Sequence, residues 1–160
     1  MSDNERYNLA LAYATRMHRG QYRIGGDEYI THPVAVASIV RQQGYGIDYQ
    51  ITALFHDLLE DTDATEHDLM VNGGTAEIVE AVRLLTKDEN CVMHEYVGAI
   101  RRNEMAFVVK NADRLHNLRC AVCTSEEFKR QYIRETKEWY LDFSDEIKEA
   151  VSLLSANTEI

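Results

Sequence analysis

Turn-forming residues are scarce in this chain, and their scarcity limits the folds open to it. The 160 residues include one proline and eight glycines. A β-sandwich or β-barrel needs turn residues at short intervals, whereas the plentiful Ala, Leu, Glu, Lys and Arg are strong helix formers. We therefore expect an all-α protein.

The spacing of apolar residues divides the chain into helical segments. Tyr7, Leu11 and Ala14 recur at intervals of three and four, as on a helix that buries one face. The run 107–109 could open a strand, but apolar residues keep helical spacing from Val108 to Val122 and favour a helix. The predicted helices span residues 4–19, 31–43, 48–59, 65–71, 75–85, 91–102, 104–122, 125–140 and 144–154.

Length and charge narrow the classes of protein. With 160 residues, 45% of them hydrophobic, the chain is long enough for one buried core, and we expect a single domain over residues 1–160. A formal net charge of −10 argues against binding to nucleic acid or to an anionic membrane. No segment approaches the roughly 20 apolar residues of a membrane span, and the polar start is not a secretion signal. These features predict a cytoplasmic protein whose ligand is a small molecule.

Three cysteines are present, an odd number that makes a disulfide framework improbable in such a protein. Cys120 and Cys123 have the spacing of a redox or zinc pair, but no second pair accompanies them. We therefore expect ordinary packing for these side chains.

Residues of the types that bind divalent cations stand inside or beside apolar helical segments: His32, His56, Asp57 and Asp113. Two imidazoles and two carboxylates around one ion leave positions open for water and phosphate, which suits hydrolysis of phosphate esters. Taken alone, His56-Asp57 also fits a solvated helix end, and His32 also fits a capping or packed histidine.

Two further features favour the metal interpretation. Glu60 and Asp61 follow Asp57 within about one helical turn, and so many carboxylates beside apolar residues need a cation. The segment from Lys110 to Arg119 also carries several polar side chains on a helix that must otherwise pack.

Together these motifs resemble the HD phosphohydrolase superfamily. More narrowly, they are similar to the hydrolase domain of the RelA/SpoT homologues and their single-domain relatives, the small alarmone hydrolases. The resemblance runs from about residue 8 to residue 120, through RMHRGQYR at 16–23, YITHP at 29–33, HDLLEDT at 56–62, VKNADR at 109–114 and DRLHN at 113–117.

The resemblance implies an all-α HD-domain bundle and a reaction. It implies that one Mn²⁺ ion, or another divalent metal, is bound by His32, His56, Asp57 and Asp113. The implied activity is removal of the 3′-pyrophosphate from guanosine 3′,5′-bis(diphosphate), ppGpp, or a close relative. Glu60 and Asp61 are then expected to position and activate the attacking water.

The resemblance also implies nucleotide contacts. Arg23 is expected to pack against the purine, and Asn117 to lie near the nucleoside. Further candidates, for phosphate or for structural ion pairs, are Arg16, Lys110 and Arg114. Two positions depart from the usual family pattern, and they bear on base preference: Ile24 replaces a lysine and Cys120 replaces a threonine.

Two other functions stay open on the sequence. One is an HD-family nucleotide phosphatase that acts on another phosphorylated nucleotide, such as NADPH or a mononucleotide. The other is a non-catalytic binding module on the same helical scaffold. A homo-oligomer is also compatible with the sequence. The spacing of the aromatic residues favours a core or dimer face over a nucleotide-stacking platform at Tyr132, Trp139, Tyr140 and Phe143.

Overall fold

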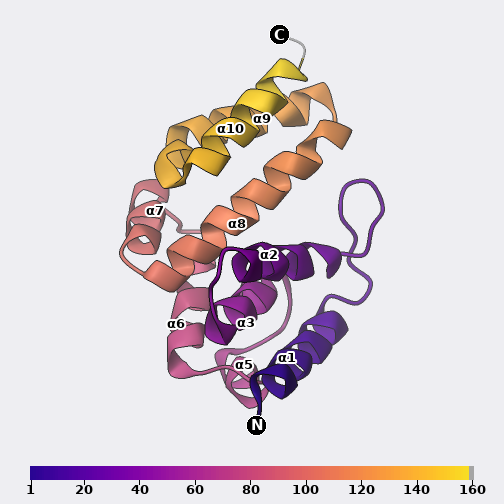
Figure 1. Cartoon of the computed structure of the whole chain (residues 1–160), viewed down its shortest axis with the longest axis vertical. Coiled ribbons are helices and arrows are strands. Elements are labelled where there is room, and N and C mark those ends of the chain that lie inside the picture. The colour runs from indigo at the N-terminus through magenta and orange to yellow at the C-terminus, as the bar shows by residue number, and fades with distance from the viewer. Residues whose placement is uncertain (159–160) are drawn as a thin grey trace.

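The computed structural model describes residues 1–158, and it confirms the all-α fold (Figure 1). Within these residues the only β-type pairing is an isolated bridge between Tyr22 and Glu28. The elements are α1 (Asp3–Met17), α2 (Thr31–Gln42), α3 (Ile47–Phe55), α4 (Leu58–Asp61), α5 (Glu66–Val71), α6 (Ala76–Leu85), α7 (Met93–Arg101), α8 (Glu104–Cys120), the 3₁₀ turn η1 (Ala121–Cys123), α9 (Glu126–Trp139), η2 (Leu141–Phe143) and α10 (Asp145–Ala156).

Local sequence signals set where many of these helices begin. A hydroxyl or amide side chain just before the first turn accepts a backbone N–H three residues later, at Ser2, Thr65, Thr75, Asn103, Ser125 and Ser144. Such caps satisfy N–H groups that have no partner inside the helix. In α2 the chain's one proline, Pro33, lies in the first turn, where its missing N–H costs nothing.

Helix α8 is the central element of the bundle. It contacts α2, α3, α6, α7 and α10, and it crosses the middle of the molecule between the N-terminal helices and the α9/α10 pair (Figure 1). The run 107–109 lies within α8, as its spacing predicts. Buried residues that α8 contributes to the shared core include Val109, Ala112 and Leu115. A helix packed on so many sides can hold polar side chains only where partners are supplied.

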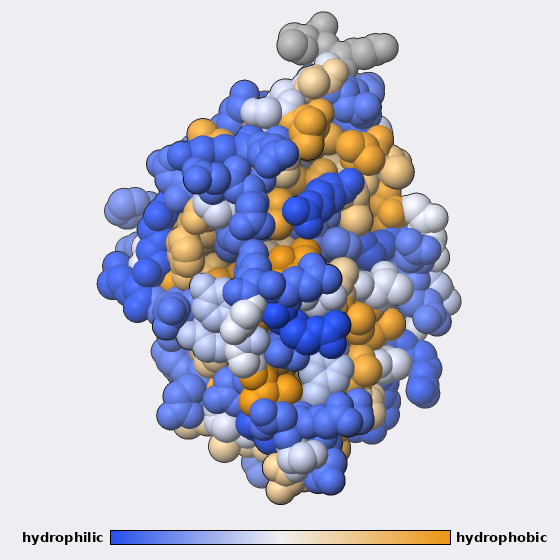
Figure 2. Space-filling model, in the orientation of Figure 1, coloured by the Kyte–Doolittle hydropathy of each residue, from blue (hydrophilic) through white to orange (hydrophobic). Residues whose placement is uncertain are grey.

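The outer faces of the helices are mostly polar. Figure 2 shows one face of the molecule, on which hydrophilic residues predominate and hydrophobic residues form smaller separate patches. Among the described residues, no helix is both long and apolar enough to cross a membrane.

One predicted helix is divided in the structure, whereas the other boundaries shift by a few residues at most. The single helix expected over 48–59 is two helices, because α3 ends at Phe55 and α4 begins at Leu58. At the break, Nδ1 of His56 lies 2.6 Å from the carbonyl oxygen of Ala53, and the helical pattern stops. His56 and Asp57 therefore lie on a turn between helices rather than side by side on one helix.

Candidate metal centre and adjoining pocket

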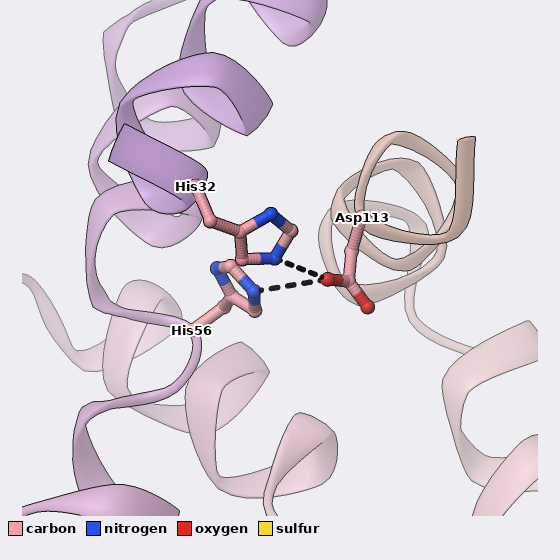
Figure 3. Close-up of side chains that lie close together, drawn as sticks. All are labelled: His32, His56 and Asp113. Atoms are coloured by element: carbon pink, nitrogen blue, oxygen red, sulfur yellow. Dashed lines mark hydrogen bonds and ion pairs between the residues drawn. The ribbon is translucent and has the colours of Figure 1, made fainter. Parts of the chain in front are cut away.

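Three helices bring His32, His56 and Asp113 together (Figure 3). His32 is the second residue of α2, His56 follows the last residue of α3, and Asp113 lies inside α8. Oδ1 of Asp113 is 2.7 Å from Nε2 of His32 and 3.3 Å from Nε2 of His56. All three side chains are buried, so the packing of the helices fixes the cluster.

The second nitrogen of each imidazole also has a partner. Nδ1 of His56 contacts the Ala53 carbonyl oxygen, which only accepts hydrogen bonds, so Nδ1 carries a proton. Nδ1 of His32 is 2.8 Å from Nδ1 of His116, and the two rings stack with centroids 5.0 Å apart. Contacts of this kind orient metal-ligating histidines and select their tautomer.

Asp57 adjoins the three-residue cluster. Its Oδ2 lies 3.1 Å from Nε2 of His56 and 3.9 Å from Nε2 of His32. The same oxygen accepts a hydrogen bond of 2.6 Å from the hydroxyl of Tyr29. The residues predicted as metal ligands thus lie together at the meeting point of α2, α3 and α8.

Opposing charges favour the ionised forms of Asp113 and His56, whereas burial lowers the pKa of His32. Burial would raise the pKa of Asp113, but Lys110, with Nζ 3.3 Å from Oδ2, and the two imidazoles hold it well below its usual range. Burial would likewise lower the pKa of His56, yet Asp57 and Asp113 outweigh it and raise that pKa. The two carboxylates therefore create a demand for positive charge at the cluster.

These residues fit a divalent cation. Donor atoms bound to one ion at about 2.0–2.2 Å lie roughly 3 Å apart, and the separations at Asp113 Oδ1 are 2.7 and 3.3 Å. Imidazole nitrogens combined with carboxylate oxygens suit Mn, Fe, Co and Zn. His32, His56 and Asp113 could hold such an ion, with Asp57 beside them.

The predicted catalytic carboxylates, Glu60 and Asp61, lie on α4, directly after the turn that carries Asp57. Both are exposed. Oε1 of Glu60 accepts a hydrogen bond of 2.7 Å from the backbone N–H of Lys87, between α6 and α7. Although Asp61 is exposed, the protein around its carboxyl group removes part of the hydration, and this desolvation and the negative charges of Asp57 and Glu60 raise its pKa to about 6.

A cavity of about 270 Å³ lies next to the cluster, between the loop after α1, the end of α8 and the start of α9. Arg23 and Asn117 both line it, and Nη2 of Arg23 donates to Oδ1 of Asn117 at 2.9 Å. The Nδ2 group of Asn117 is 3.4 Å from Oδ1 of Asp113, so the cavity is joined to the cluster. The departures Ile24 and Cys120 line the same cavity.

The other predicted substrate residues lie elsewhere. Lys110 is buried and pairs with Asp113, and Arg114 is buried with Nη2 2.7 Å from Oε1 of Glu135. Both side chains therefore form structural ion pairs, the alternative to a phosphate contact. Arg16 is exposed on α1, 5.2 Å above the ring of Tyr13. None of the three is among the described residues that line the cavity, because α8 directs Lys110 and Arg114 into the core.

Sequence reasoning missed the site roles of Tyr29 and Phe128, and for Tyr132 it favoured a core or dimer face over a nucleotide-stacking surface. Tyr29 holds Asp57, and its place three residues before His32 in the YITHP stretch was the available signal. Phe128 and Tyr132 line the cavity with stacked rings, 5.5 Å apart. Of the aromatic stripe predicted to be a core or dimer face, Tyr140 and Phe143 are in the core, whereas Tyr132 lines the cavity. Cys120 and Cys123 are free but exposed, not packed as expected.

An all-α bundle that gathers a sequential His-Asp pair with a further histidine and aspartate is the architecture of HD domains. The chain belongs to this family, since the HD domain model matches residues 10–145.

The names of similar curated proteins refer to ppGpp hydrolysis. The chain is 38% identical over 133 residues to a guanosine-3′,5′-bis(diphosphate) 3′-pyrophosphohydrolase of Haemophilus influenzae, a match that covers 77% of this chain and 20% of the relative. It is 35% identical over 146 residues to the bifunctional (p)ppGpp synthase/hydrolase SpoT of Escherichia coli K12, covering 85% of this chain and 21% of that protein. The chain thus spans about one fifth of the length of these relatives.

A solved structure has the same fold. It is described as a metazoan ortholog of SpoT that hydrolyzes ppGpp, and it matches with a TM-score of 0.73 at 24% identity, covering 94% of each chain. At that identity, the likeness supports the helical architecture only.

Proposed function

We propose that this protein is a metal-dependent phosphohydrolase that removes the 3′-pyrophosphate from ppGpp or a closely related alarmone. The observation that carries the proposal is the buried cluster of His32, His56 and Asp113 beside a cavity that is lined by Arg23 and Asn117. The names of the curated relatives support the choice of substrate. A nucleotide substrate of this kind supports a cytoplasmic location for the enzyme.

The proposed ligands of one divalent cation, with Mn²⁺ as the expected ion, are His32, His56, Asp57 and Asp113. When bound, such an ion lowers the pKa of a water molecule and polarises a phosphoryl oxygen. Lys110 keeps Asp113 ionised, and Tyr29 holds the Asp57 carboxylate in place. The protein's part is to keep these donors together in a buried setting.

Within the carboxylate pair, the contacts favour different roles. Glu60 is tethered by the backbone N–H of Lys87, which suits a residue that orients its neighbours. Asp61 has a pKa near 6, close to the range in which a general base is most effective at neutral pH. We assign proton acceptance from the attacking water to Asp61.

The cavity is the proposed nucleoside site. Arg23 presents a planar guanidinium that is fixed by Asn117, a geometry suited to stacking on a base. Phe128 and Tyr132 provide aromatic surface on the opposite element, α9. Because Asn117 also contacts Asp113, a nucleoside in this cavity would lie next to the cluster.

Turnover with identified products tests the proposal. The protein is incubated at fixed Mn²⁺ with ppGpp, its adenosine analogue, NADPH and ordinary mononucleotides, and products are separated by ion-exchange chromatography. We expect ppGpp to yield GDP and pyrophosphate. Preferential release of a 5′-phosphate from a mononucleotide would contradict the alarmone assignment, and tight nucleotide binding without hydrolysis would favour a non-catalytic module.

A second substrate class is favoured by one observation. Ile24 and Cys120, the two departures from the family pattern, both line the nucleoside cavity, and Ile24 is 70% exposed. Compared with the family pattern, the cavity has Ile24 in place of a lysine and Cys120 in place of a threonine. The absence of that ammonium group and that hydroxyl weakens the case for strict guanine selection. Hydrolysis of another phosphorylated nucleotide, such as NADPH, is therefore the alternative outcome of the same panel.

A further inference from the structure

Helix α4 carries both proposed catalytic carboxylates on a very short support. It has four residues, Leu58–Asp61, and an isolated helix of that length is not stable in water. The side chain of Leu58 is fully buried and anchors one side of the turn. The last carbonyl groups of a helix have no partners within it, so contacts from outside must fix the end at Asp61.

Gln21 supplies such a contact from the loop after α1. Its Nε2 donates a hydrogen bond of 2.9 Å to the backbone carbonyl of Asp61. The amide oxygen, Oε1, lies 2.8 Å from Nδ1 of His18. Because a carbonyl only accepts, the amide nitrogen must face Asp61; Oε1 therefore faces His18, and Nδ1 of His18 must carry the proton. The three groups form one directed chain.

Packing holds the His18 ring, the first member of this series of hydrogen bonds, in place. Its side chain is 2% exposed, and its ring packs against Tyr29 with centroids 4.8 Å apart. The backbone N–H of Tyr29 donates to the carbonyl of Gln21 at 2.9 Å, and the Tyr29 hydroxyl holds Asp57. The loop before α2 thus grips both ends of the segment 57–61, through Tyr29 at Asp57 and through Gln21 at Asp61.

The location of Gln21 matters for the chemistry. An open groove of about 400 Å³ is lined by Met17, Gln21, Glu60 and Asp61, together with Thr62 and Asp63. Gln21 is only partly buried there, so replacing its side chain removes the contact with Asp61 without opening the hydrophobic core. A shift of α4 along this groove would move the Asp61 carboxylate relative to the metal cluster.

We propose that Gln21, oriented by His18, is a positioning residue for the hydrolysis, because it holds α4 so that Asp61 faces the attacking water. The inference rests on the proposed function. It assigns Gln21 no contact with substrate or metal, so its loss affects the chemical step and leaves binding intact.

The test compares Gln21→Met, which keeps length but removes both hydrogen bonds, with the control Gln131→Met on the exposed surface of α9. For Gln21→Met we expect kcat for ppGpp to fall about 10- to 100-fold, as small misplacements of catalytic groups do. KM and the Mn²⁺ dissociation constant should stay within about twofold of the unmodified protein. The control should change none of these values.

A second pair of variants tests whether His18 acts by donating a hydrogen bond to Gln21. Asn at position 18 can place an N–H near the site of imidazole Nδ1, whereas Phe keeps the packing on Tyr29 but donates nothing. We expect His18→Asn to retain more of kcat than His18→Phe. Equal losses for the two variants would show that His18 acts by packing alone.

Hydrogen–deuterium exchange separates this inference from the proposed function. Gln21→Met should speed exchange of the amides of residues 58–62 and leave those of α2 unchanged, whether or not ppGpp is the substrate. An unchanged kcat together with unchanged exchange at α4 would overturn the positioning role, as would a parallel loss of Mn²⁺ affinity. An inactive unmodified protein would overturn the proposed function alone.

Discussion

The metal cluster and helix α4 are neighbours that are built in opposite ways. His32, His56 and Asp113 come from α2, α3 and α8 and are buried where these helices meet. Glu60 and Asp61 are exposed on a single turn that is held by hydrogen bonds from Gln21 and Lys87. The core therefore fixes the binding groups, while a few polar contacts fix the groups assigned to proton transfer.

The same contrast appears in two aspartates. Lys110 and the imidazoles hold the pKa of Asp113 well below its usual range despite burial. Partial desolvation and the neighbouring carboxylates raise the pKa of Asp61 to about 6. Environment alone thus gives identical side chains different pKa values, which suits the proposed roles of Asp113 as a metal ligand and Asp61 as a base.

Removing the charge at the centre of the cluster should have the largest effect. Asp113→Asn takes away the anion that both imidazoles contact. A bound metal would supply several kcal/mol of transition-state stabilisation, so its loss should lower turnover by at least about 1000-fold. Calorimetric titration should show no Mn²⁺ binding. The exposed Asp142→Asn is the control, and tight Mn²⁺ binding by Asp113→Asn would show that the cluster is not the metal site.

The next variant changes a side chain on α4 and leaves the cluster residues unchanged. Asp61→Asn removes the proposed base, which should lower kcat about 100-fold, while Mn²⁺ affinity stays unchanged because Asp61 is not among the cluster residues. Steady-state kinetics and calorimetry on the same preparation measure both. If Mn²⁺ binding disappears together with activity, Asp61 belongs to the metal site and the contrast between the two regions fails.

Tyr29 joins the two regions, and its hydroxyl should have a smaller effect. Tyr29→Phe removes the hydrogen bond to Asp57 but keeps the ring that packs on His18 and His32. Loss of a contact that orients a metal ligand should weaken Mn²⁺ binding about 10-fold. Tyr49→Phe is a matched control, since it removes a hydroxyl that donates to Glu104, which is not one of the cluster residues. Equal Mn²⁺ affinities in the two variants would assign Tyr29 no role in the cluster.

The smallest expected effect is a shift in the pH profile. Ionised Asp61 is the active form, so kcat should rise with pH through its pKa of about 6. Glu60→Gln removes a negative charge that raises this pKa and keeps an oxygen for the Lys87 N–H, so the midpoint should move to lower pH by less than about one unit. Glu77→Gln, exposed on α6, should leave it in place. An upward shift would exclude Asp61 as the titrating base.

The sequence predicts the helices better than the contacts among them. Apolar spacing and capping residues placed the helical segments, since both signals are local. The break between α3 and α4 was missed, because it depends on the bond from the His56 ring to Ala53 and on the cluster around it. The ligand residue types and the family pattern singled out candidate metal ligands, and the fold brings His32, His56 and Asp113 together from distant segments.

The surroundings of the site could not be predicted in the same way. Whether Lys110 meets substrate or Asp113 depends on the direction in which α8 presents it to the core. Phe128 and Tyr132 lie on α9, and only the tertiary packing brings them to the cavity beside Arg23. Tyr29 and Gln21 act through single hydrogen bonds to another segment, which no periodic pattern encodes.

The most direct test of the central claim, that one cation at this cluster drives hydrolysis, is a Mn²⁺ titration of metal-stripped protein with ppGpp cleavage as the readout. The account predicts negligible turnover without metal and a rise to a plateau at one equivalent of Mn²⁺ per chain. Cleavage that persists at full rate in the presence of a chelator would contradict it.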